Sequence, residues 1–152
     1  MGEGNCIFLH LSPLMTKKSK PRKGLNRQQK RDLDIEIGFL EGVVRRDPGY
    51  LDALQILGDD YTQRGKYQEG LRIDKALAQL RPDDSLVHYN LACSYSLTEQ
   101  HDLVLKSLET AFACGYRDFK WLAEDPDLEA FRADEGYVKV KSMIRKLKVK
   151  KA

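Results

Sequence analysis

The sequence contains few of the residues from which disulfide frameworks, metal centres and catalytic sites are built. Its three cysteines, Cys6, Cys93 and Cys114, are odd in number and far apart, with no CxxC spacing. We therefore expect neither a disulfide scaffold nor a zinc site. The three histidines are also scattered, with no nucleophile or metal-binding arrangement around them.

Phosphate-binding motifs are missing as well, because the chain has neither a GxxxxGK[ST] loop nor a GxGxxG turn. The acidic cluster around Asp125 and Asp127 lacks the alternating ligands and central glycine of a calcium loop. We predict that the protein is not an enzyme and that it uses no cofactor and no metal.

Long apolar runs are a further absence. No window approaches the roughly 18 consecutive apolar residues that a membrane span requires, so we expect no transmembrane segment. The apolar stretch from Cys6 to Met15 lacks a basic residue ahead of it, contains Pro13 and precedes lysines; it does not resemble a signal peptide. Together with the scattered cysteines, this predicts a cytoplasmic location.

The composition that is present suits one soluble domain, with 152 residues of which 41% are hydrophobic and 32% charged. Its net charge of +3 conceals strong segregation. From Lys17 to Arg31 there are eight basic residues and no acidic one, and from Tyr137 to Ala152 seven basic and none acidic. The body between them carries 11 basic and 22 acidic residues, so it attracts cationic partners and its own tails.

The arm KKSKPRKGLNRQQKR has two interpretations. Its composition is typical of tails that bind nucleic acid or an anionic surface, and equally typical of a solvated basic tail that improves solubility. Both alternatives stay open.

The strongest pattern in the body is an internal repeat with a period of about 34 residues. Windows 51–84 and 85–118 align without a gap, and a large apolar, a small and an aromatic residue recur at positions i, i+1 and i+4. The equivalent pairs are Leu57 and Leu91, Gly58 and Ala92, and Tyr61 and Tyr95. On a helix this spacing places the three side chains on one side, where the small residue allows a neighbouring helix to approach.

Residues that end helices divide each window into two helices. Gly65 can adopt the left-handed conformation that ends a first helix, and Pro82 stops a second one. Asp84, with its neighbours, offers side-chain acceptors that cap the next helix. Pro48 precedes Pro82 by one full period and follows an apolar stripe that begins at Leu33, so a half repeat precedes the two whole repeats.

This pattern resembles the tetratricopeptide repeat family. The residues that carry the resemblance are LQILGDDYTQRGKYQEGL and YNLACSYSLTEQHDLVLKSLETA, within residues 51–118. The resemblance implies an all-α fold, a right-handed α-solenoid of antiparallel helical hairpins, that binds a protein or peptide in a concave groove. The predicted layout is a disordered basic arm at 1–25 and a helical domain at 26–152. That domain comprises a half repeat at 26–50, repeats at 51–84 and 85–118, and capping helices at 119–149.

Two positions depart from the family pattern. Gly70 stands where the family usually has alanine, and Asp74 where it usually has a large apolar residue. Either Asp74 faces inward, or this helix is shifted by one residue so that Ile73 does.

The C-terminal segment is similar to the caps that often follow such repeats, with Trp121 as a core residue. We predict short helices at 119–124 and 126–132 and a longer one at 134–148. The last is amphipathic and basic, with Tyr137, Val140 and Ile144 on its apolar face. We favour a closing helix over a membrane-surface or partner-binding helix.

In this family the first helix of each hairpin lines the concave face, which implies a partner-binding groove. Its residues are Asp52, Gln55, Asp59 and Thr62 on one helix and Leu86, Tyr89, Cys93 and Ser96 on the next. Some members clamp the C-terminal carboxylate of a chaperone with lysines and asparagines. Asn90 matches one such asparagine. The positions of the family's cationic residues are occupied here by acidic or uncharged residues, Asp59 among them. We predict no chaperone-tail clamp and a preference for basic or apolar segments.

Overall fold

A computed structural model of the chain describes residues 24–149. All regular structure in this range is helical, which confirms the predicted all-α class for this part of the chain. The helices are α1 (Arg27–Arg46), α2 (Leu51–Arg64), α3 (Tyr67–Leu80), α4 (Ser85–Leu97), α5 (His101–Ala113), α6 (Phe119–Glu124), the 3-10 helix η1 (Pro126–Leu128), α7 (Glu129–Arg132) and α8 (Tyr137–Val149). The arm predicted to be disordered lies outside the described residues, except for Gly24 and Leu25.

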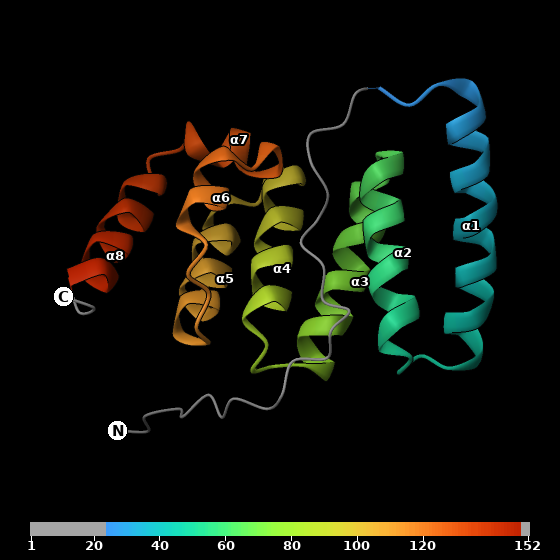
Figure 1. The fold of residues 1–152 in the computed structure, drawn as a ribbon, viewed down its shortest axis with the longest axis horizontal. Coiled ribbons are helices and arrows are strands. Elements are labelled where there is room, and N and C mark those ends of the chain that lie inside the picture. Colours follow the sequence, from blue (N-terminus) through green and yellow to red (C-terminus); the bar gives the residue numbers. More distant parts are fainter. Residues whose placement is uncertain (1–23, 150–152) are drawn as a thin grey trace.

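Helices α1 to α5 pack in the order of the sequence, each against the next (Figure 1). Short connections fold each helix back along its predecessor. Helices η1 and α7 contact α4, and α8 contacts α5. The C-terminal segment therefore covers one end of the row, whereas α1 stands at the other end with α2 as its principal neighbour.

Polar contacts reinforce the packing of α1 against α2. Arg64 Nε donates to Asp34 Oδ1 at 2.8 Å, and Tyr61 OH donates to Glu41 Oε1 at 2.6 Å. Beneath them Ile37 is buried in an apolar cluster that both helices share. The contacts of α1 with the rest of the described chain thus run mainly through α2.

The two turns between paired helices have the same backbone geometry. Gly65 has a φ of 82°, and Glu99, at the equivalent position of the next window, has a φ of 59°. In each turn the next amide donates to the carbonyl of the aromatic residue, Tyr61 at 2.8 Å or Tyr95 at 2.9 Å. The second turn contains no glycine, so its left-handed residue has no signal in the amino-acid pattern.

The structure resolves the register of α3. Asp74 is 3% exposed and its carboxylate accepts a hydrogen bond from the Ser94 hydroxyl on α4. Ile73 is partly buried and packs against the apolar clusters around Leu57 and Leu77, and a Cβ on Gly58 would lie 3.2 Å from its Cγ2. Asp74 therefore faces inward, where the Ser94 hydroxyl pairs with its carboxylate, and the helix is not shifted by one residue.

The C-terminal helices follow the prediction with local differences. The first begins and ends as expected, whereas the second divides into η1 and α7, and the third begins at Tyr137 because Asp134 accepts from the Gly136 amide at 2.8 Å. Tyr137 and Val140 are buried, and Ile144 packs against the same core. The apolar face of α8 therefore packs on the core, as expected of a closing helix, and Trp121 packs against the same core as predicted.

Candidate functional site

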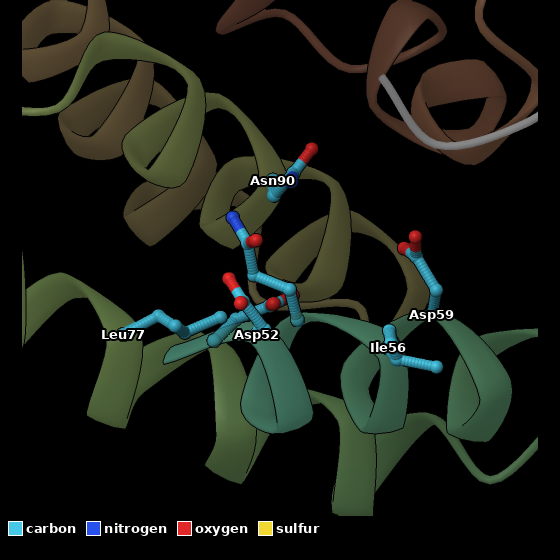
Figure 2. Close-up of a pocket in the computed structure, with 7 residues that line it drawn as sticks. Asp52, Ile56, Asp59, Leu77 and Asn90 are labelled. Atoms are coloured by element: carbon cyan, nitrogen blue, oxygen red, sulfur yellow. The ribbon is translucent and has the colours of Figure 1, made fainter. Parts of the chain in front are cut away.

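A hollow of about 170 Å³ opens between α2, α3 and α4. We call it the acidic hollow, and its lining residues are Asp52, Gln55, Ile56, Asp59, Asp74, Leu77 and Asn90. Figure 2 shows Asp52, Ile56 and Asp59 along α2, with Leu77 beside them and Asn90 on the neighbouring helix. The hollow is thus formed by the first helices of the two repeat windows and by the helix between them.

Helical periodicity explains why α2 supplies four of these residues. Asp52, Gln55, Ile56 and Asp59 follow the spacing i, i+3, i+4 and i+7, which places them on one face. The opposite side of α2 carries buried residues such as Leu57. On α4, Asp84 fixes the start of the helix by accepting from the Leu86 and Val87 amides, and this orients the following turns.

The charged side chains that line the hollow are all acidic. Among residues 24–149 it is lined by three aspartates, two amide side chains and two apolar residues, and by no basic side chain. The side-chain oxygen of Asn90 is buried and has no hydrogen-bond partner among the described residues. Buried polar atoms in proteins are nearly always paired, so this oxygen is an exception within the described part of the chain.

The structure brings three of the predicted groove residues together. Asp52, Gln55 and Asp59 all line the acidic hollow. Leu86 is partly buried and packs against the core formed with the C-terminal helices, so it does not belong to the hollow.

The other four predicted groove residues are buried, and their inclusion in an open groove was wrong for this structure. Thr62 and Ser96 are each 1% exposed, Tyr89 is 1% exposed and Cys93 is fully buried. The first two occupy equivalent positions in the two windows. The other two are covered because η1 packs on α4.

A network of polar contacts holds this C-terminal cover, the helix η1, against α4. Tyr89 OH donates to Asp125 Oδ2 at 2.7 Å, and the Tyr89 ring stacks on Tyr116 with centroids 4.3 Å apart. Asp125 also accepts from the Asp127 amide at 3.0 Å, which starts η1. Burial and the neighbouring Asp125 raise the pKa of the Tyr89 hydroxyl, so it stays a donor.

Four lining residues were absent from the predicted groove: Ile56, Asp74, Leu77 and Asn90. The match of Asn90 to the family's groove asparagine was the one available signal. Leu77 and Asp74 belong to α3, the second helix of a hairpin, and their contribution depends on how closely α2 and α4 approach each other.

Next to the hollow residue Asp59 lies a buried carboxylate. Asp60 is 5% exposed and its Oδ2 has no hydrogen-bond partner among the described residues. Burial, with smaller contributions from Glu36 and Asp59, raises the pKa of Asp60 to about 7. Asp60 occupies the position in the first window that Ser94 occupies in the second. Ser94 donates to Asp74, but the residue one period before Asp74 is the apolar Leu40, which cannot form the corresponding bond with Asp60.

Other candidate chemistry in residues 24–149 has structural roles. The His88 ring bonds the Pro82 carbonyl at 2.6 Å, consistent with the predicted structural histidine, and His101 pairs with Asp134 at 2.8 Å. No group of histidine, cysteine, aspartate or glutamate side chains in this range could hold a metal. None of its helices has the length and hydropathy needed to cross a membrane.

Comparisons with known proteins give one partial similarity. The chain is 36% identical over 83 residues to a protein of Arabidopsis thaliana whose name describes it as chloroplastic. The matched part is 53% of this chain and 25% of that protein, so the chain spans about a quarter of the relative's length. No family model matches the chain, and no solved structure matches it.

Proposed function

We propose that the protein is a non-catalytic interaction module, a right-handed α-solenoid of the tetratricopeptide type, which binds a segment of a partner protein in the acidic hollow. The observation that carries this proposal is the position of the hollow between α2 and α4, the first helices of successive repeat windows. It is open to a ligand on the side of Ile56, which is 46% exposed.

The repeated geometry supports the solenoid interpretation. Equivalent residues have similar burial, with Tyr61 8% and Tyr95 9% exposed. The left-handed turn residues also recur at equivalent positions of the two windows. A stack of such units leaves a shared surface between first helices, and repeat proteins use this surface for recognition.

The location is open to a direct test. The sequence predicts a cytoplasmic protein, whereas the name of the similar Arabidopsis protein places that protein in the chloroplast. We propose the cytoplasm, with a plastid location as the alternative. Imaging a C-terminally tagged full chain in plant cells distinguishes them, because accumulation in plastids would overturn the cytoplasmic proposal.

Site-specific photo-crosslinking tests the binding function. A photoreactive amino acid in place of Ile56 would lie at the hollow, and the same amino acid in place of Val138, 63% exposed on α8, serves as the matched control. In an extract of cells that express the protein, we expect a discrete adduct from position 56 and none of the same mass from position 138.

The outcome is decided by comparing the two positions. An adduct that forms equally from both sites would mean nonspecific contact, and no adduct from position 56 would contradict binding at the hollow. Mass spectrometry of the adduct then identifies the partner segment.

A second candidate is binding to nucleic acid or an anionic surface. The observation that favours it is a set of exposed basic side chains on α8: Lys139, Lys141, Arg145, Lys146 and Lys148. Such binding depends on released counterions and should weaken steeply between about 50 and 200 mM salt. Absence of a gel shift with single- or double-stranded oligonucleotides, and of vesicle binding, at low salt would remove this candidate.

A further inference from the structure

We infer that the outward face of α1 is a self-association surface, on which the α1 of a second copy of this chain packs in the antiparallel direction. This inference goes beyond the proposed function, because the face points away from α2 and therefore from the acidic hollow. It is carried by two exposed apolar side chains at the end of the helical row and by the order of the charges around them.

The helix α1 carries apolar side chains on two opposite faces. Leu33, Ile37 and Leu40 are buried and form a cluster with residues of α2. Ile35 and Phe39, one turn apart on the other side, are 67% and 70% exposed. A helix that packs on one side only usually has polar residues on its outward face, so this second apolar face indicates a second packing partner.

The outward face of α1 lies at the end of the row of helices (Figure 1). At the opposite end η1 and α7 pack on α4, and α8 packs on α5, whereas no element within residues 24–149 covers Ile35 and Phe39. Arrays of helical hairpins expose apolar surface at an end unless a further element covers it. The α1 of a second copy would provide this cover.

The spacing along the outward face suits a helix as the partner. Asp32, Ile35, Phe39, Gly42 and Arg46 follow one another at alternating intervals of three and four residues, which is the spacing of paired helices in coiled coils. A Cβ on Gly42 would meet no atom within 4 Å, so this position leaves room for a side chain of the second copy.

The order of the charges favours an antiparallel pair. Phe39 lies midway between Asp32 and Arg46, about two turns from each. With the two Phe39 side chains at the symmetry axis, Asp32 of each copy would lie level with the partner's Arg46. The exposed Arg31 would likewise lie level with the partner's Asp47, one residue farther out. A parallel pair would instead place like charges side by side, which is unfavourable.

Asp32 and Arg46 are accessible for these contacts. Both are exposed, and the Asp32 carboxylate accepts a hydrogen bond from the side-chain amide of Gln28, on the same helix, at 2.7 Å. An ionised carboxylate can accept several hydrogen bonds, so the guanidinium of a second copy can bind to it as well. Neither residue lines the acidic hollow.

Sedimentation of the full chain at increasing concentration tests the inference. Because two helix faces form a small interface, we expect a weak dimer that dissociates between about 1 and 200 µM. Phe39→Gln should leave a monomer over this range. Val138→Gln, at a residue that is 63% exposed on α8, is the matched control and should leave the dimer unchanged. Circular dichroism and urea unfolding verify that each variant folds.

Charge reversal tests the antiparallel register. Asp32→Arg alone would bring two arginines together at each end of the pair, and Arg46→Asp alone would bring two aspartates together. Each change should raise the dimer dissociation constant by about tenfold or more, because like charges then face each other. Asp102→Arg, at an exposed site on α5, is the control and should change the constant by less than about twofold.

The symmetry of the pair also predicts a rescue. A double variant with both Asp32→Arg and Arg46→Asp restores opposite charges at each end, so it should dimerise about as well as the wild type. An equimolar mixture of the two single variants should form dimers for the same reason, since each copy then meets opposite charge at both ends.

Three results would overturn the inference. A monomer at every concentration would mean that another part of this chain or a different partner covers α1. A dimer that survives Phe39→Gln would form through another surface, such as the basic arm of one copy on the acidic body of the next. Failure of both the double variant and the mixture to restore the dimer would contradict the antiparallel register.

Discussion

Gly65 and Glu99 occupy equivalent positions in the two repeat windows, and both hold the left-handed backbone conformation that ends the first helix of a pair. In both turns the hydrogen bonds are the same, including a bond from the left-handed residue's amide to a carbonyl three residues earlier, at 3.1 Å in each case. The turn is therefore imposed by the packing of the helices it joins, since one occurrence has the residue best suited to it and the other does not.

Glycine at the second turn should stabilise the protein. The Cβ of Glu99 is strained at φ 59°, and left-handed geometry costs a non-glycine residue roughly 1 kcal/mol. We expect Glu99→Gly to raise the free energy of unfolding by about that amount in urea titrations. Glu109→Gly, in the interior of α5, should instead lower it by about 1 kcal/mol; the same sign for both changes would contradict the strain.

Alanine should have opposite effects at two helical glycines. A Cβ on Gly38 of α1 meets no atom within 4 Å, whereas a Cβ on Gly70 of α3 would lie 3.0 Å from Thr62 Oγ1, which is held by its bond to the Gly58 carbonyl. Gly38→Ala should stabilise by about 0.5–1 kcal/mol through helix propensity. Gly70→Ala should destabilise by about 1 kcal/mol or more because of the close contact. Thermal unfolding of the two variants measures both signs.

Asp60 should make stability depend on pH. Its pKa of about 7 in the folded chain exceeds the value of about 3.9 in an unfolded chain, so the folded state holds this proton more tightly. The stabilisation is therefore complete below about pH 4 and is lost as the pH rises to about 7. Relative to the wild type, Asp60→Asn should be more stable by on the order of 2 kcal/mol at pH 8.

Below pH 4 the same substitution should have little effect, because Asp60 is then neutral in both states. The exposed Asp102 on α5 provides the control, and Asp102→Asn should give no comparable difference between the two pH values. Urea unfolding at pH 4 and pH 8 measures all four differences. A constant effect of Asp60→Asn at both values would show that the carboxyl is not protonated in the folded protein.

Removal of the Tyr89 hydroxyl should loosen the C-terminal cover. Tyr89→Phe withdraws the donor at 2.7 Å from the buried Asp125, and an under-satisfied buried carboxylate costs about 1–3 kcal/mol. We expect lower stability and faster amide hydrogen exchange in η1 and α7. Tyr67→Phe, at a tyrosine that is 40% exposed, should change neither; unaltered exchange in the Tyr89 variant would mean that apolar packing alone holds the cover.

The acidic hollow was predictable in part. The resemblance to the tetratricopeptide repeat family implied that Asp52, Gln55 and Asp59 share a groove, and the structure finds these three residues together. Asp74 and Leu77 were missed because they lie on α3, the second helix of the hairpin. The distance between α2 and α4 decides whether side chains of α3 line the hollow between them.

The local elements could be read from the amino-acid order: the helical class, the left-handed end at Gly65, the cap at Asp84 and the apolar face of α8. Each of these depends on side chains within one or two turns, through periodicity and capping, so a linear pattern contains it. Tertiary packing, in contrast, closes off Tyr89 and Cys93 and brings Asp52 and Asn90 to the border of the same hollow. This outcome could not be read from the pattern because Asp125, on a distant segment, returns to bond the Tyr89 hydroxyl, and no property of α4 alone specifies which neighbour will cover it.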